Sequence, residues 1–196
     1  MANYELITIP YNREEAVAYA DYWAYRRNPK YYAFDEIGGD CTNFVSQAVF
    51  AGSGVMNFTP TYGWFYLNLN ERAPAWTGVE YFYNFMTQNK GPGPFGREMP
   101  LNQLQPGDAI QLMLGDRTDF GHTVIVMSIE GEEKTPDTIR VAAHDRDCNC
   151  RPLSTYNYSQ LRAIHLEGVR YFSLIGEPEP ASPLAEEERP PLPKEE

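Results

Sequence analysis

One segment carries most of the information in this chain: Gly38-Gly39-Asp40-Cys41-Thr42-Asn43-Phe44-Val45-Ser46-Gln47, residues 38–47. Two glycines interrupt whatever precedes them, and Asp40 is a favourable N-cap, so a helix is predicted to begin at Cys41. Glycines 52 and 54 end that helix. One face of the helix is apolar at helical spacing and carries Phe44, Val45, Ala48 and Val49. Cys41 is therefore expected in the first turn of a buried helix.

The position of Cys41 suggests a nucleophilic thiol. A thiol attacks as the thiolate, and the free N–H groups and dipole of a helix N-terminus lower its pKa. The same N–H groups can contribute to an oxyanion hole. Asp40 opposes this effect, because a nearby anion disfavours a thiolate, unless its side chain turns away to cap the helix. On position alone, a buried structural thiol explains Cys41 equally well.

The histidines favour the nucleophile. His122 opens a predicted strand over residues 123–129, and His144 ends the next one, residues 139–143. Paired antiparallel strands can bring both imidazoles to a helix-borne thiol, which is the arrangement of a Cys–His pair with an orienting third group. His122 is the predicted base and His144 the predicted orienter, with Asp145 as a competitor for that role. His165 is interpreted as a surface or core histidine.

The rest of the chain predicts an α+β fold. A first helix is expected after Asn12, with Glu15 completing a capping box, and a third helix after Thr77 with Glu80. Strands are expected at residues 109–114, 123–129, 139–143 and 169–175. Helices come first and strands later, and the connections are too short for regular βαβ units, so the sheet is predicted to be antiparallel.

Bulk composition narrows the class of protein. The 196 residues suit one domain with a real core, and 42% hydrophobic with 14% aromatic content excludes a disordered body. A formal charge of −11 argues against nucleic acid or an anionic membrane as partner. No apolar run approaches the roughly 20 residues of a membrane span. Residues 1–10 carry no signal peptide, so we expect a cytoplasmic protein or one exported by a leaderless route.

Two other features receive plain interpretations. Residues 177–196 are rich in proline and acid, and are predicted to form a disordered tail that solubilises the domain of residues 1–176 or docks on a protein partner. Cys148 and Cys150 are too closely spaced for a zinc knuckle and are interpreted as incidental or redox-labile thiols in a loop. A metal site with His144, Asp145 and Asp147 is the alternative. Asp108 is interpreted as a turn acid before a strand.

Together these residues resemble the putative amidase domain family, which is related to the NlpC/P60 and CHAP groups of the papain-like superfamily. The resemblance spans about residues 11–175, and its most specific block is Asp-Cys-Thr-Asn-Phe-Val-Ser-Gln, residues 40–47. Further matching segments are Tyr11-Asn12-Arg13, Asn28-Pro29-Lys30-Tyr31-Tyr32, Trp64-Phe65-Tyr66, Trp76-Thr77, Pro106-Gly107-Asp108, Gly121-His122-Thr123 and Ala143-His144-Asp145.

The resemblance implies roles for individual residues. Cys41 becomes the nucleophile, His122 the base and His144 the third polar residue. Relatives of the NlpC/P60 group support the oxyanion with a tyrosine upstream of the cysteine, for which Tyr32 and Tyr31 are the candidates, Tyr32 slightly preferred. Asp40, Asp145 and Trp64 are further candidates for contact with the oxyanion or the substrate.

The sequence thus predicts a papain-like α+β domain of the NlpC/P60 type, with N-terminal helices packed on an antiparallel sheet. The predicted activity is cysteine-dependent hydrolysis of an amide bond in a peptide or cell-wall muropeptide, through a thioester acyl-enzyme and without metal or cofactor. The alternatives are an acyltransferase with the same Cys–His pair, a non-catalytic binding or structural module that docks through its acidic tail, and a toxin or effector hydrolase.

Overall fold

Helices dominate the first half of the chain and strands the second half, as the sequence predicted. The computed structural model describes residues 3–175, so the predicted tail at residues 177–196 lies outside the described part. The helices are α1 (Arg13–Trp23), α2 (Cys41–Ser53), α3 (Pro74–Thr77) and α4 (Val79–Gln88). The strands are β1 (Tyr4–Ile9), β2 (Tyr66–Asn68), β3 (Glu71–Arg72), β4 (Gly93–Met99), β5 (Ala109–Leu114), β6 (His122–Ile129), β7 (Ile139–Ala143), β8 (Cys148–Pro152) and β9 (Tyr158–Leu174).

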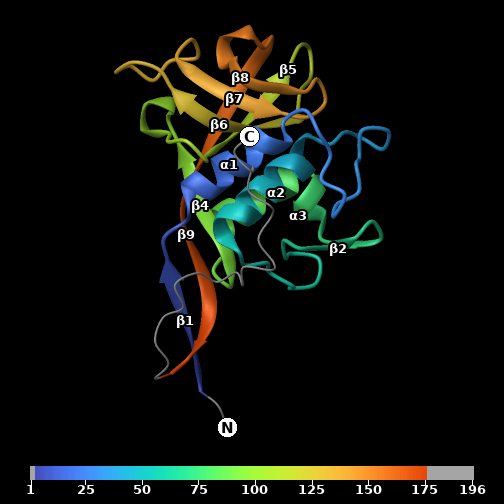
Figure 1. The fold of residues 1–196 in the computed structure, drawn as a ribbon, viewed down its shortest axis with the longest axis vertical. Coiled ribbons are helices and arrows are strands. Elements are labelled where there is room, and N and C mark those ends of the chain that lie inside the picture. Colours follow the sequence, from blue (N-terminus) through green and yellow to red (C-terminus); the bar gives the residue numbers. More distant parts are fainter. Residues whose placement is uncertain (1–2, 176–196) are drawn as a thin grey trace, which may run out of the picture.

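An antiparallel sheet of seven strands organises the molecule, in the order β1-β9-β5-β6-β7-β8 with β4 also paired to β9 (Figure 1). Strand β9 is the centre of this sheet. β5 pairs with its residues 158–164 and β1 with its residues 169–174, both along one edge. β4 pairs with residues 163–170 along the other edge. The fold is therefore α+β with an antiparallel sheet.

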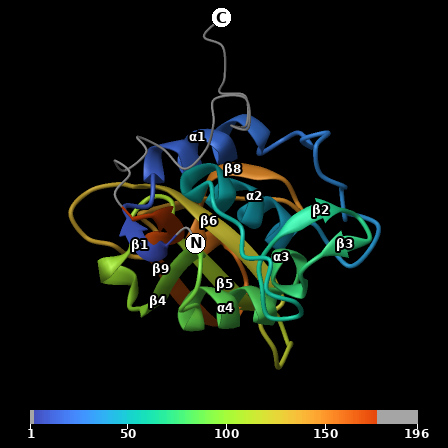
Figure 2. The ribbon, with the colours of Figure 1, turned by 90° about the horizontal axis from the view of Figure 1, so that it is seen from below.

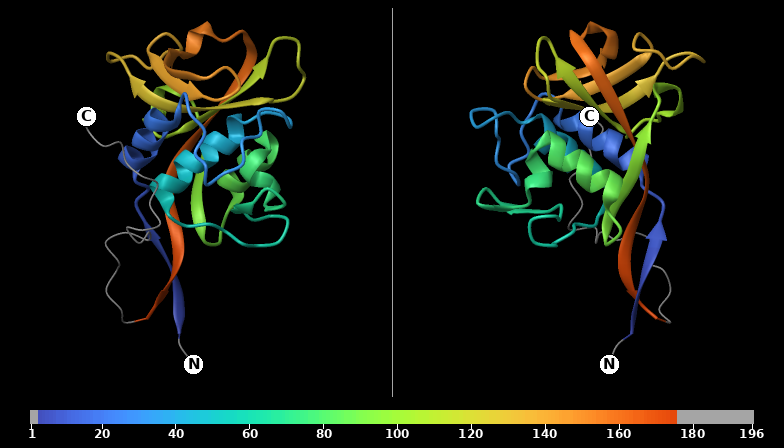
Figure 3. Two further views of the ribbon diagram at one scale, coloured as in Figure 1. Left: turned by 45° about the vertical axis from the view of Figure 1, so that its right-hand side comes forward. Right: turned by 180° about the vertical axis from the view of Figure 1, so that it is seen from behind.

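The far end of β9 leaves the body of the molecule. There it pairs with β1 as a two-stranded ribbon that projects away from α2, α3 and α4 in every side view (Figures 1 and 3). The short hairpin of β2 and β3 lies at the periphery beside α3 (Figure 2). The helices and the strands β5 to β8 thus form the part of the molecule in which the candidate residues lie.

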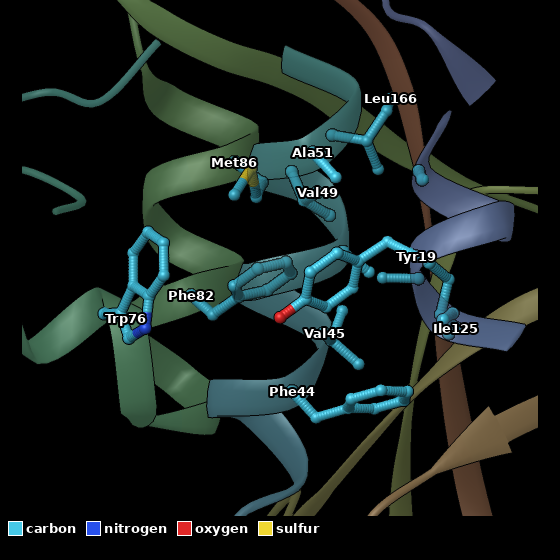
Figure 4. Close-up of a cluster of buried hydrophobic side chains, with 14 of the residues drawn as sticks. Tyr19, Phe44, Val45, Val49, Ala51, Trp76, Phe82, Met86, Ile125 and Leu166 are labelled. Atoms are coloured by element: carbon cyan, nitrogen blue, oxygen red, sulfur yellow. The ribbon is translucent and has the colours of Figure 1, made fainter. Parts of the chain in front are cut away.

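Helix α2 is the central element of the core. It is buried along almost its whole length and packs against α1, α3 and β6. Figure 4 shows Phe44, Val45 and Val49 of α2 between Tyr19 of α1 and Phe82 of α4. Burying each of these large side chains contributes about 1.5–3 kcal/mol. This packing holds the first turn of α2 against the sheet.

A second apolar cluster covers the opposite face of the sheet. Alternation along β6 divides its side chains, because Ile125 faces the helices while Val124 and Val126 join Leu104 and Leu153 on the other side. Both faces of the middle strands are buried in consequence. No helix among residues 3–175 has the length and apolar character that crossing a membrane requires.

Two of the three predicted helix starts are confirmed. The Asn12 side chain accepts from the Glu15 N–H at 3.1 Å, and α2 begins at Cys41. Gly54 ends α2 in the left-handed region, with φ 65°, where glycine is favoured. The prediction that Thr77 caps the third helix is wrong: Thr77 is the last residue of α3, and Gly78 stands at the N-cap of α4. The Thr77 hydroxyl instead accepts from Arg72.

The strands were predicted less completely than the helices. β5 and β7 have the predicted bounds, and β6 begins one residue earlier, at His122. The predicted strand at 169–175 corresponds to the end of the much longer β9, which stops at Leu174. Cys148 and Cys150 lie on β8 rather than in a loop. Five strands had no counterpart among the predictions: β1, β2, β3, β4 and β8.

Candidate active site

Cys41 is the first residue of α2 and is almost fully buried, with 5% of its surface exposed. Its sulfur lies 3.8 Å from the hydroxyl of Thr42. That hydroxyl in turn lies 2.9 Å from the hydroxyl of Thr123, the second residue of β6. Since both threonines are fully buried, this contact fixes the start of α2 against the start of β6. The strand residue before Thr123 is His122.

His122 and Asp145 complete a compact cluster with Cys41. One side-chain atom from each, the sulfur, a ring nitrogen and a carboxylate oxygen, lies within 4.8 Å of the other two. His122 is also buried, and its ring packs at 5.6 Å from the ring of Tyr156. The sequence prediction that Cys41 and His122 come together is therefore matched by their placement. A small movement brings such groups to hydrogen-bonding distance, as is common when substrate binds.

The Asp145 carboxylate occupies the N-terminus of α2. Its Oδ1 accepts from the Asp40 N–H at 2.6 Å and its Oδ2 from the Cys41 N–H at 3.2 Å. Asp145 has a left-handed backbone, φ 72°, which costs free energy in a residue other than glycine. Gly39 makes the close approach possible, because a Cβ there would lie 2.6 Å from Asp145 Oδ2. The acid therefore sits where the oxyanion hole was expected.

This electrostatic environment differs from the predicted one. Burial, followed by the charge of Asp145, raises the pKa of the Cys41 thiol to about 12. Burial lowers the pKa of His122 to about 4, against the opposing effect of Asp145. The prediction that the helix N-terminus lowers the pKa of Cys41 is therefore corrected. In the resting structure the pair consists of a neutral thiol and a neutral imidazole.

His144 does not hold the His122 ring, and this prediction is corrected. Its Nδ1 lies 2.5 Å from Asp40 Oδ2, its Nε2 lies 3.0 Å from the carbonyl oxygen of Trp23, and its ring stacks on Phe44. Sheet register explains the error. Ile125 of β6 pairs with Ala142 of β7, and extending that register by three residues sets position 145, not 144, opposite His122. The ring of His144, the residue before Asp145, faces Asp40 and the Trp23 carbonyl oxygen instead.

Asp40 is fully buried and has structural partners. The prediction that it contacts the substrate or the oxyanion is therefore wrong. Its Oδ1 accepts from the Phe34 N–H and the Asn43 amide, each at 2.8 Å. Its Oδ2 lies 2.5 Å from Nδ1 of His144. The Asp40 side chain makes no N-cap hydrogen bond to α2. The cap is supplied by Asp145 instead.

Arg27 ties the turn that carries Asp145 to the rest of the molecule. Its guanidinium donates to Asp147 at 2.9 and 3.0 Å and to Asp35 at 2.5 and 2.9 Å, and it lies 3.6 Å from Asp40. The turn between β7 and β8, residues 144–147, is therefore held by Arg27 at Asp147 and by the start of α2 at Asp145. Sequence reasoning missed Arg27.

The aromatic candidates for substrate contact lie outside the cluster. Trp64 is fully buried, donates to the Ser46 hydroxyl at 3.0 Å and packs 4.7 Å from Trp76, so the prediction that it contacts the substrate or the oxyanion is wrong. Tyr31 stacks on Trp76, and burial raises its pKa. Tyr32 has an exposed ring that packs on Phe34. The structure brings neither tyrosine ring into contact with Cys41 through any described interaction within residues 3–175.

The remaining candidates have structural partners. Asp108 is fully buried and pairs with Arg13 at 2.7 Å and His165 at 2.8 Å, which supports the structural interpretation of both the acid and the histidine. Cys148 is buried beside the Tyr156 hydroxyl at 3.4 Å, and Cys150 is exposed. Tyr156, which also touches His122, was missed. Its place in Pro-Leu-Ser-Thr-Tyr, residues 152–156, carries no chemical signal in the sequence.

A thiol at a helix start beside an imidazole at a strand start defines a Cys–His site. The comparison with known proteins agrees with the resemblance seen in the sequence. The chain belongs to the putative amidase domain family, whose model matches residues 10–166. The residues of the Cys–His site all fall within that match.

One similar protein is the uncharacterized protein YhbB of Bacillus subtilis strain 168. It is 31% identical over 120 residues, which cover 60% of this chain and 37% of YhbB. This chain therefore corresponds to little more than a third of its relative's length. No solved structure matches the chain.

Proposed function

We propose that this domain is a cysteine-dependent amide hydrolase, with Cys41 as nucleophile and His122 as general base and acid. The observation that carries the proposal is the cluster of Cys41, His122 and Asp145 within 4.8 Å at the start of α2. Membership of an amidase family supports the reaction class. The papain-like arrangement, a nucleophile helix packed on an antiparallel sheet that carries the histidine, belongs to the same proposal.

The chemistry begins from neutral groups. As the sulfur attacks the amide carbonyl, a ring nitrogen of His122 takes the thiol proton. The C–N bond then breaks, and His122 returns the proton to the departing amine, leaving a thioester on Cys41. Water attacks the thioester carbonyl while His122 takes a proton from the water; the C–S bond then breaks, the carboxylic acid leaves, and His122 returns the proton to the sulfur. A ring that is neutral at pH 7 suits the steps in which His122 accepts a proton.

Asp145 takes a positioning role in this proposal. The Cys41 N–H can stabilise the oxyanion of the tetrahedral intermediate, as a free N–H at a helix N-terminus does. In the resting structure that N–H donates to Asp145. The substrate carbonyl oxygen therefore displaces the Asp145 carboxylate, which moves towards the His122 ring and stabilises the imidazolium. The substrate class we propose is a peptide or cell-wall muropeptide amide.

The test is to trap the acyl-enzyme. The protein is mixed with peptide amides and muropeptides, quenched in acid and digested, and the mass of the Cys41 peptide is measured. Cys41→Ala should abolish hydrolysis, and His122→Ala should slow it by about 10²–10⁴-fold. Cys148→Ala is the matched control, because it removes another buried thiol. An acyl group found on Cys148, or full activity in Cys41→Ala, would show that the proposed mechanism is wrong.

A second arm separates hydrolysis from acyl transfer. Hydroxylamine is added during turnover, and the products are analysed for the free acid and the hydroxamate. A hydrolase gives mainly the acid at low hydroxylamine, whereas an acyltransferase releases its acyl group to the amine and turns over poorly without it.

A further inference from the structure

The Cys41, His122 and Asp145 side chains offer three different kinds of metal ligand at one point. Within the described residues 3–175, they are the one group of three such side chains whose ligand atoms converge this closely. Thiolate, imidazole and carboxylate are the three side-chain ligands that Zn²⁺ takes in proteins. The same three side chains are therefore suited to binding a metal ion as well as to nucleophilic attack.

The distances are close to those of a tetrahedral site. Zn–S bonds of about 2.3 Å and Zn–N or Zn–O bonds of about 2.0–2.2 Å place neighbouring ligand atoms about 3.5 Å apart. The three atoms already lie within 4.8 Å of one another. Contraction by about 1 Å, shared among three side chains, completes the geometry. Three protein ligands leave the fourth position for water.

The surroundings prepare the ligands for a cation. The His122 ring presents a nitrogen atom to the other two ligand atoms, and a neutral imidazole nitrogen can bond to the metal. The Asp145 carboxylate is oriented by the N–H groups of Asp40 and Cys41, and each oxygen keeps a lone pair after accepting one hydrogen bond. Such outer contacts fix the direction of metal ligands. On binding, the Cys41 S–H proton leaves to solvent and the sulfur bonds to the metal.

We propose that Cys41, His122 and Asp145 form a binding site for Zn²⁺ or another thiophilic divalent cation, which masks the thiol until the metal is removed. The metal site itself does not depend on the proposed hydrolase function. That metal binding inhibits hydrolysis, by masking the Cys41 thiol, rests on the proposed function. Loss of one protein ligand weakens the site more than loss of either of the other two thiols in the chain.

The binding test uses the whole protein, reduced and freed of metal by chelation. Zinc bound per chain is measured by equilibrium dialysis, and Co²⁺ is added in a parallel sample to record the near-ultraviolet absorption of a cobalt–thiolate bond. We expect one equivalent and a thiolate band in the wild type and in Cys148→Ser/Cys150→Ser. Cys41→Ser should lose the band, and Asp145→Ala should weaken zinc binding at least tenfold.

A second readout is the protection of Cys41. Zinc should slow alkylation of Cys41 by iodoacetamide at least tenfold in the wild type, and chelator should restore the rate. Equal zinc affinity in the wild type and Asp145→Ala would overturn the proposal. So would zinc binding that is lost in Cys148→Ser/Cys150→Ser but kept in Cys41→Ser. Neither result affects the acyl-enzyme test, so failure of the metal site and failure of the hydrolase mechanism are distinguishable.

Discussion

The charge of Asp145 beside the thiol makes Asp145→Asn the most informative substitution. Asparagine keeps the size of the side chain and tolerates the left-handed backbone better than other residues without the charge. Its amide oxygen can still accept from one of the two backbone N–H groups at the start of α2. The variant thus removes the anion and one hydrogen bond. We expect the pKa of Cys41 to fall.

The size of that fall follows from the geometry. The Asp145 carboxylate oxygen lies within 4.8 Å of the sulfur. A unit charge at that limiting distance disfavours the thiolate by about 3.5 kcal/mol at an effective dielectric constant of 20, and by about 0.9 kcal/mol in water. Because Asp145 is partly exposed, the true value lies between these limits. At about 1.36 kcal/mol per unit, the expected decrease is about 0.6–2.5 pKa units.

The assay is the rate of iodoacetamide alkylation of Cys41 between pH 6 and 11, followed by mass spectrometry of the peptide that contains it. Asp147→Asn is the matched control, since it removes an acid from the same turn that pairs with Arg27 rather than with the thiol. The wild-type rate should rise with pH through the range without a plateau, and Asp145→Asn should shift the profile to lower pH. An unchanged or raised profile in Asp145→Asn would refute the electrostatic account of the site.

Two further predictions concern stability. Burial lowers the pKa of His122 from 6.5 to about 4, so between these pH values the unfolded chain binds a proton at this residue and the folded chain does not. The free energy of unfolding should therefore fall as the pH drops from 6.5 to 4, by up to about 3 kcal/mol. The free energy of unfolding, measured with urea at pH 7, 5.5 and 4, should fall less in His122→Gln than in the wild type. The same pH dependence in both proteins would contradict this. His144→Gln should lower the free energy of unfolding by about 1–3 kcal/mol, because Asp40 Oδ2 loses its buried hydrogen-bond partner. The double variant with Asp40→Asn should lose less than the sum of the two single changes, and additivity would count against the pair.

The helices were predictable because their signals are local. The cap at Asn12, the two glycines before Asp40 and the apolar face of α2 all lie within a few residues of the structure they specify. Thr77 shows the limit of such signals. A capping motif reads the same whether its first residue starts a helix or, as here, ends a shorter one that begins at Pro74.

The sequence predicted which residues form most of the site, but not which of them contact one another. Cys41 and His122 could be found because their residue types and element ends suggest chemistry. The choice between His144 and Asp145 depends on strand register, and a shift of one residue exchanges the two faces. The raised pKa of Cys41 depends on burial and on an acid more than a hundred residues away, which no local pattern contains.

Strand β9 also sets a condition on how the molecule is made. It comes last among the described strands, yet β1 and β4 pair with no other strand among residues 3–175, and β5 has it as one of its two neighbours. At about 5–20 residues per second, a ribosome needs on the order of ten seconds to pass from β1 to the end of β9. During that time β1 and β4 of the nascent chain have no partner strand, and Cys41 is not yet enclosed by the complete sheet. The sheet that buries this thiol can close only after β9 has emerged, so its folding is governed by the slow joining of distant segments.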